Sequence, residues 1–302
     1  MEAEIEVIRF KTTVTKVALC LIFSDLIILS LETVVKQIIL SEGCTTNTLS
    51  TAICWASGYL FGFLVIFPLM GKILHVHLLH LWNGAKVDLK KIKHYIPAGF
   101  TFLAIGLFLF CMPLLTLLQR AGLRSPSNSE IGSNGSFFLT VLLIALEVFI
   151  GPLYEEILCR GLLLSVLTPY GKCFAIIISS ILFSLGHGNF TQLFQTFLFG
   201  LVLAYVTLET GSIKNSYILH VINNGLTLVP NIVANYVIIA ILGGIGIGLL
   251  IKERQAIMKN LRMEKDNFVL VEHRTRRFFY NPLMLLYLIY LIAKLIHSVR
   301  LL

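Results

Sequence analysis

Long apolar runs alternate with short polar or basic segments along the whole chain. About 20 consecutive apolar residues suffice for a helix that crosses the hydrocarbon core of a bilayer. We predict eight such spans, at residues 17–40, 49–71, 96–119, 137–167, 174–188, 192–208, 217–229 and 236–251. A last apolar stretch, at residues 283–299, is either a ninth span or an interfacial helix. The pattern therefore predicts an all-α fold, a polytopic transmembrane helix bundle of about eight spans plus a C-terminal apolar helix.

Composition agrees with this class, since 57% of the 302 residues are hydrophobic and only 13% are charged. The net charge of +8 does not indicate a nucleic-acid partner. The basic residues instead gather between spans, at residues 72–95 and 252–280. Such loops face the cytoplasm. We therefore expect a multi-pass protein of the cell membrane with cytoplasmic basic loops, and the Ile-, Leu- and Lys-rich composition with short loops favours a bacterial source.

One span carries charges that crossing a membrane does not require. Residues 137–167 include Glu147, Glu155, Glu156 and Arg160. Each ionisable group at membrane depth costs about 2.5–3.5 kcal/mol on insertion scales, and such groups usually mark a functional site. Glu156 and Arg160 are four residues apart and share a helix face, so they are expected to pair. Glu155 points elsewhere and is free to act on a group outside its own helix.

Two later runs each contain a histidine. His187 follows Phe183 by four residues, and His220 precedes Asn224 by four, so each pair shares one helix face. A glutamate in a low-dielectric site suits a general base, and a neighbouring histidine can share the water and move the proton. A second histidine and an asparagine amide suit the stabilisation of an oxyanion. These residue types predict hydrolysis of a carbonyl compound, most plausibly a peptide bond.

The motifs EEILCR, FSLGH and HVINN match the patterns EExxxR, FxxxH and HxxxN of the CPBP family, which includes the CAAX prenyl endoproteases and Abi-type bacteriocin-processing or self-immunity proteins. The resemblance covers roughly residues 137–230. It implies that Glu155 activates water together with His187, and that His220 and Asn224 form the oxyanion pocket. It also implies that Glu156 and Arg160 order the site, with Phe183 as a further motif residue. Relatives often have glycine at the position of Ala204 and proline at that of Ser216.

The resemblance divides the chain into N-terminal transmembrane helices (1–136), a CPBP-like catalytic helix core (137–230) and a C-terminal part (231–302) with a helix, a basic segment and a final apolar helix. We favour a metal-free glutamate mechanism without a cofactor. Zinc held by two histidines and a glutamate is the alternative. Asn224 is a poor zinc ligand and suits an oxyanion pocket better.

The leading functional hypothesis is an intramembrane endopeptidase that cleaves a membrane-associated peptide or protein within the lipid bilayer. A second hypothesis is a membrane scaffold that acts in bacteriocin self-immunity or sensor-kinase regulation without cleaving. A transporter is a weaker third, because acidic residues in the spans, such as Asp25 and Glu32, suggest it while the repeat symmetry of transporters is missing. Simple alternation of spans would place His187 and His220 near opposite surfaces. We therefore expect that the helix carrying Glu155 is long and tilted, and that the chain forms a short or broken helix around residues 186–188, so that both histidines reach the same site.

Overall fold

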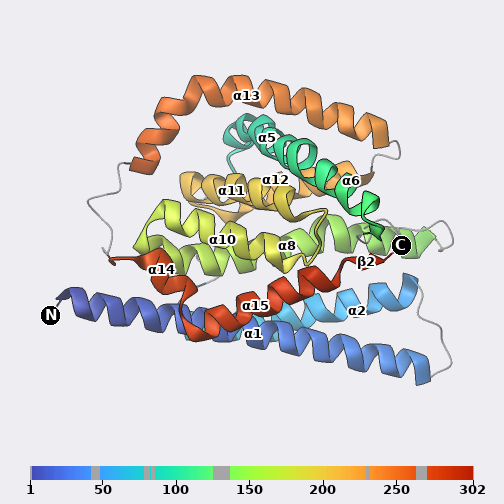
Figure 1. Cartoon of the computed structure of the whole chain (residues 1–302), viewed down its shortest axis with the longest axis horizontal. Helices are drawn as coiled ribbons and strands as arrows, with labels where there is room; N and C mark the ends of the chain where they lie inside the picture. Colours follow the sequence, from blue (N-terminus) through green and yellow to red (C-terminus); the bar gives the residue numbers. More distant parts are fainter. Residues whose placement is uncertain are drawn as a thin grey trace.

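The apolar runs form helices that lie side by side along one axis (Figure 1). The computed structural model describes residues 2–41, 48–77, 82, 86–124, 137–228, 232–262 and 271–301. The first part of the chain contains α1 (Glu2–Ser41), α2 (Thr48–Phe61), η1 (Gly62–Ile66), α3 (Phe67–Leu74), α5 (Leu89–Ala104), η2 (Ile105–Cys111), α6 (Met112–Arg120) and β1 (Leu123–Arg124).

The central part is one long helix followed by three shorter ones. The long helix comprises α7 (Phe137–Ile144), η3 (Ala145–Ile150), α8 (Gly151–Glu156), η4 (Ile157–Leu163), α9 (Leu164–Leu167) and η5 (Thr168–Tyr170). It is followed by α10 (Lys172–Gly186), α11 (Leu193–Thr210), α12 (Ile213–Gly225) and η6 (Leu226–Leu228). The chain continues through α13 (Ile232–Arg262), α14 (Arg274–Phe279), α15 (Pro282–His297) and β2 (Arg300–Leu301).

Neighbours in the stack follow a simple order. α13 packs on α5, α5 on α11, α11 on α10, α10 on α15, α15 on α1 and α1 on α2 (Figure 1). Among the described residues, the only strand pairing joins β1 to β2 in antiparallel register. The all-α helix-bundle prediction is therefore confirmed.

Six of the described helices are long and apolar enough to cross a membrane: Glu4–Ser41, Leu49–Leu74, Leu89–Arg120, Phe137–Tyr170, Leu193–Thr210 and Val233–Lys259. The predicted spans at 174–188 and 217–229 correspond to α10 and α12, which have 15 and 13 residues. Both are shorter than a simple crossing needs. The protein is a multi-pass membrane protein, while the count of eight spans stays a prediction.

Three of the long helices contain a π-helical turn two residues ahead of a proline. The turns η1, η2 and η3 precede Pro68, Pro113 and Pro152, respectively. Proline cannot donate a backbone hydrogen bond, and its ring collides with the carbonyl four residues earlier. A wider turn relieves that collision without ending the helix. The helix that carries Glu155 and Glu156 therefore stays continuous through Pro152.

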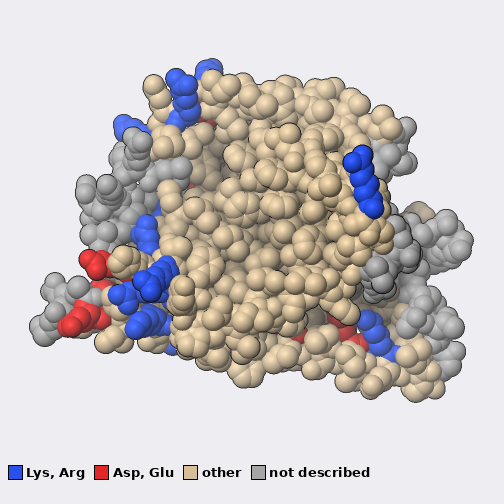
Figure 2. Space-filling view, in the orientation of Figure 1, with Lys and Arg blue, Asp and Glu red and all other residues tan. Residues whose placement is uncertain are grey.

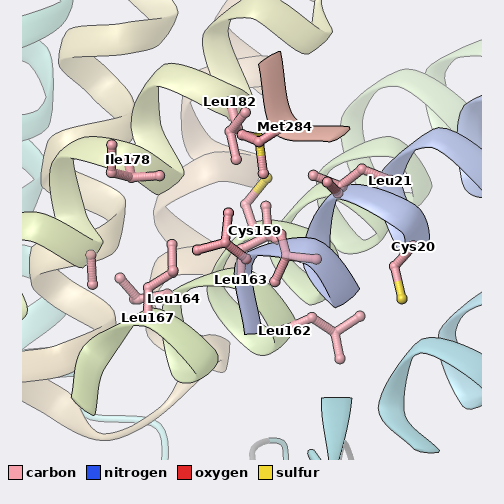
Figure 3. Close-up of a cluster of buried hydrophobic side chains, with 14 of the residues drawn as sticks. Cys20, Leu21, Cys159, Leu162, Leu163, Leu164, Leu167, Ile178, Leu182 and Met284 are labelled. Carbon is pink, nitrogen blue, oxygen red and sulfur yellow. The ribbon is translucent and has the colours of Figure 1, made fainter. Parts of the chain in front are cut away.

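The main hydrophobic core surrounds the second half of this helix. Residues 159–167 pack between Leu21 of α1, Ile178 and Leu182 of α10, and Met284 of α15 (Figure 3). The cluster thus combines residues from all three predicted segments of the chain, and the division into three segments stays a prediction. This packing fixes the height and rotation of the helix that carries the glutamate pair.

The charge distribution separates the two ends of the bundle from its middle. Most visible Lys and Arg residues gather at the left end of Figure 2, and the middle of that face is nearly free of charge. The Nε2 atom of His94 lies 2.7 Å from the Oε2 atom of Glu253, which joins the two basic segments 72–95 and 252–280 directly. The described residues around His94 and Glu253 therefore lie at the same end of the bundle.

Candidate active site

The glutamate pair sits at the end of α8, where the two side chains meet different surroundings. The Glu155 side chain is 32% exposed and faces a cavity, whereas the Glu156 side chain is completely buried. Adjacent helix positions are about 100° apart, which accounts for the difference. The sequence prediction that Glu155 points away from its own helix agrees with this geometry.

Glu156 and Arg160 form a buried ion pair. The Nη1 atom of Arg160 lies 3.1 Å from the Oε1 atom of Glu156, and neither side chain is exposed. Arg160 also donates from Nη2 to the Gly200 carbonyl of α11, at 3.3 Å, and its guanidinium lies 4.3 Å from the centre of the Phe183 ring. Arg160 therefore ties the glutamate helix to both α10 and α11.

Gly200 allows α11 to approach this pair. A Cβ atom at this position would lie 3.2 Å from Cδ1 of Phe183 and 3.2 Å from Cβ of Ser180. Both are tighter than ordinary van der Waals contact, so a side chain here would push α11 away from α10. The absence of a side chain is what places the Gly200 carbonyl within reach of Arg160.

His187 caps the C-terminal end of α10. The helix ends at Gly186, and Gly188 turns the chain with φ of 59°, which matches the break expected around residues 186–188. The Nδ1 atom of His187 lies 2.8 Å from the Phe183 carbonyl. A carbonyl only accepts, so Nδ1 carries the proton and donates. This leaves Nε2 directed toward Glu155, with 3.9 Å between Nε2 and Oε1.

His220 on α12 lies between the two glutamates. Its Nδ1 atom is 3.0 Å from Oε1 of Glu156, and its Nε2 atom is 3.5 Å from Oε2 of Glu155. Because the Glu156 carboxylate accepts a hydrogen bond from the Nδ1–H group, it fixes the orientation of the imidazole ring. The contact between Glu156 and His220 was not predicted from the sequence, which assigned Glu156 only to Arg160.

Phe183 is the side chain against which these groups pack. Its ring centre lies 4.8 Å from that of His187 and 5.7 Å from that of His220, both with edge-on geometry. Together with the Arg160 contact, this gives the motif phenylalanine a physical role. It separates the charged groups from the surrounding core and holds their relative positions.

Asn224 lies one helical turn after His220 and lines the same cavity as Glu155. Its Nδ2 atom donates to the Glu147 carbonyl at 3.1 Å, and its Oδ1 atom accepts from Nδ2 of Asn223 at 3.2 Å. The amide is therefore held in a fixed orientation beside the glutamate helix. The structure thus brings Glu155, His187, His220 and Asn224 together, although they lie on three separate parts of the chain.

The cavity in front of Glu155 has a volume of about 500 Å³. Besides Glu155, His187 and Asn224, it is lined by residues of α1, α2 and α15. Asp25 of α1 accepts a hydrogen bond from the Tyr287 hydroxyl of α15, at 3.1 Å. Lys294 of α15 donates to the Gly186 carbonyl next to His187, at 3.4 Å.

These wall residues lie outside the three motifs and were missed as site residues. The only signal in the sequence is that no basic residue lies three or four positions from Asp25. Glu32 and Lys36 are four residues apart in the sequence and could pair along α1, but in the described part of the chain these two side chains form no ion pair within 4 Å. Glu32 lines the cavity instead. The helices on either side of the catalytic core thus complete the cavity.

The described residues contain no group of three or more His, Cys, Asp or Glu side chains arranged to hold a metal ion. The nearest approach to a metal site is formed by Glu155, His187 and His220, with histidine Nε2 atoms 3.9 Å and 3.5 Å from the Glu155 carboxylate oxygens. The choice between a metal-free site and a zinc site stays a prediction at this point.

Comparison with known proteins supplies the family. Residues 137–226 match the family model described as Type II CAAX prenyl endopeptidase Rce1-like. No curated protein and no solved structure matches the chain. The matched range contains all four converging residues together with Glu156, Arg160 and Phe183. It supports a membrane endopeptidase in general and does not favour a non-cleaving scaffold. The resemblance drawn from the three motifs is confirmed: residues 137–226 form an Rce1-like domain of the CPBP family.

Proposed function

We propose that this protein is an intramembrane endopeptidase in which Glu155 and His187 activate the attacking water. One observation carries the proposal. The Glu155 carboxylate lies at the wall of a cavity of about 500 Å³. The Nε2 atom of His187 lies 3.9 Å from one of its oxygens, and the Nε2 atom of His220 lies 3.5 Å from the other.

Water activation follows from the proton positions. The Nδ1–H group of His187 donates a hydrogen bond to the Phe183 carbonyl, so Nε2 of the neutral ring would be the acceptor for a water between it and Glu155. Glu155 takes a proton from that water as the oxygen attacks the carbonyl carbon of the substrate. The proton then passes to the departing amide nitrogen when the C–N bond breaks. Glu155 thus acts first as base and then as acid.

His220 and Asn224 are proposed to stabilise the oxyanion of the tetrahedral intermediate. Glu156 accepts the Nδ1 proton of His220 and leaves Nε2 facing the reacting groups. When Nε2 carries a proton, it can donate to the oxyanion, as can the Asn224 amide. Arg160 balances the charge of Glu156 and so keeps this carboxylate an acceptor. The mechanism needs no side chain beyond those that the motifs contain.

The substrate is proposed to be a membrane-associated peptide or protein. Most of the cavity lining comes from three helices that are long and apolar enough to span a bilayer, Glu4–Ser41, Leu49–Leu74 and Phe137–Tyr170, so a substrate would reach it from the membrane. The basic end of the bundle is proposed to face the cytoplasm, because loops rich in Lys and Arg do so. A bacterial source would fit the composition.

The test is replacement of Glu155 by glutamine, followed by comparison of membrane peptides from cells that express the variant or the wild type. Glutamine keeps the shape of the side chain but cannot take the proton, so cleavage products should disappear. Glu209→Gln is the matched control, because it makes the same change at a glutamate of similar exposure that does not line the cavity. It should retain cleavage.

Two further variants divide the proposed roles. His220→Ala and Asn224→Ala should each lower turnover by about 10²–10³-fold, the usual effect of one oxyanion donor. All variants should be present in the membrane at wild-type levels. Products that persist in Glu155→Gln at the wild-type rate would contradict the glutamate mechanism. A phenotype that survives this substitution without any cleavage would indicate the scaffold instead.

A further inference from the structure

A second cavity lies at the basic end of the bundle, far along the chain from the glutamate pair. It has a volume of about 450 Å³ and is formed by α1, α14 and the start of α15. Its lining includes Lys11, His273, Arg276 and Arg277 and contains no Asp or Glu. Four groups that are or can become positively charged therefore face one space.

The frame around this cavity is fixed by contacts that join α1 to the start of α15. The Asn281 side chain donates from Nδ2 to the Thr15 hydroxyl at 2.8 Å and accepts from the Met284 backbone N–H at 3.2 Å. Phe278 of α14 is completely buried in the main core, and Arg274 donates to the Tyr170 carbonyl. The backbone segments that carry the cations are thus joined to one another and to the main core.

The charges in the cavity are not balanced by described residues. Arg277 donates from Nε to the Glu272 backbone carbonyl, at 2.8 Å, which leaves its other nitrogens available. The Arg276 guanidinium lies 5.5 Å from the centre of the Tyr280 ring. Neither Arg276 nor Lys11 forms an ion pair with a residue that the structure describes, and both are exposed. A mobile anion would therefore meet at least three uncompensated donors.

The depth of the cavity relative to the membrane points to a lipid. Lys16 is the last basic residue before the uninterrupted apolar run of α1, which begins at Val17, and Lys11 lies six positions, or about 9 Å along the helix, before Val17. Tyr280 is 72% exposed directly before the apolar helix α15, and tyrosine at such a place typically lies at headgroup level. Figure 2 shows other Lys and Arg residues at the same end. The cavity therefore opens where lipid phosphates lie.

We propose that this cavity binds the phosphate of an anionic phospholipid headgroup. Arginine presents a planar fork that matches phosphate oxygens, and lysine adds a compact charge beside it. Anionic lipids are enriched in the cytoplasmic leaflet, toward which a basic end is oriented. α1 and α15 also carry Asp25 and Tyr287 in the wall of the catalytic cavity. Bound lipid would hold these two helices together from their basic ends.

The test measures lipid binding by the purified full chain and does not depend on proteolysis. The probes are phosphatidylglycerol, phosphatidylcholine and inorganic phosphate, each titrated against the protein in neutral detergent while bound lipid is counted by native mass spectrometry. The test variant is Lys11→Gln/Arg276→Gln. The matched control is Arg254→Gln/Lys259→Gln, which removes two exposed charges from the basic end of α13.

The wild type should bind phosphatidylglycerol in preference to phosphatidylcholine. The test variant should bind phosphatidylglycerol about 25-fold more weakly, because each basic residue near an anionic surface contributes roughly fivefold. The control should change by less than about threefold. An equal loss in both variants would show that diffuse surface charge is responsible and would overturn the proposal.

Two measurements on the wild-type chain test the proposal independently of how the variants fold. Displacement of phosphatidylglycerol by inorganic phosphate at similar concentration would overturn the assignment to a lipid. A photoactivatable phosphatidylglycerol bound to the wild-type chain should label peptides from α1, α14 or the start of α15. Labelling confined to other helices would refute the site even if the test variant failed to fold.

Discussion

Replacement of Glu156 by glutamine tests the central ion pair. The substitution removes the negative charge and keeps the shape, so Arg160 remains as a buried cation without a counterion. The two side chains are wholly buried and 3.1 Å apart. Loss of one partner from such a pair costs about 3–5 kcal/mol. For a chain of 302 residues, with an unfolding entropy of about 0.6 kcal/mol/K, that corresponds to a fall of roughly 5–8 °C in the unfolding midpoint.

Activity should fall for a separate reason. The carboxylate of Glu156 accepts the Nδ1 proton of His220 and thereby directs Nε2 toward Glu155. The amide of glutamine offers both a donor and an acceptor, so it no longer selects one tautomer of the imidazole ring. Loss of an orienting carboxylate behind a catalytic histidine lowers kcat by on the order of 10²-fold or more.

A second substitution separates these effects. Arg160→Met in the Glu156→Gln background removes the unbalanced cation and fills the space with an unbranched apolar side chain. Replacement of a whole buried pair by apolar or neutral groups is often neutral or stabilising. The double variant should therefore regain most of the lost unfolding temperature. Its activity should stay low, because the glutamine amide still does not select one tautomer of the His220 ring.

The assay follows thermal unfolding of the detergent-solubilised chain and hydrolysis of a fluorogenic peptide for all four members of the cycle. Arg160→Met alone should be as destabilised as Glu156→Gln, since it leaves a buried anion. A wild-type midpoint for both single variants would refute the interpretation as a buried ion pair. Restored activity in the double variant would refute the orienting role of Glu156.

The remaining predictions concern packing, topology and metal. Gly200→Ala should destabilise the chain by about 1–3 kcal/mol, because its Cβ would press on Phe183; Gly225→Ala, with no atom within 4 Å of its Cβ, should stay within about 1 kcal/mol of the wild type in the same unfolding assay. Single cysteines at Lys90 and Arg254, in a cysteine-free background, should react with an impermeant reagent from the same side of the membrane, and labelling from opposite sides would contradict the structure. Chelators should not inhibit the purified protease; recovery of a chelator-inactivated sample on zinc addition would instead establish the zinc mechanism.

Local relations were accessible from the sequence because helix geometry fixes them. The 3.6-residue period places Glu156 and Arg160 on one face and turns Glu155 away from it, whatever the rest of the chain does. The apolar runs likewise had to become helices, since a bilayer offers no partner for free backbone groups. The spacing of the three motifs identified the residues that carry the proposed chemistry and the family to which residues 137–226 belong.

Relations across the bundle depended on tertiary packing. His220 lies 64 residues after Glu156 along the chain, and their contact exists because α12 packs against α8. Gly200 in turn lets α11 approach Phe183 of α10, beside Arg160. The same holds for the cavity wall formed by Tyr287 and Asp25, which join the two ends of the chain. No periodicity within one helix encodes these distances. They result from how side chains of different helices fill a shared core, and that is a property of the folded chain alone.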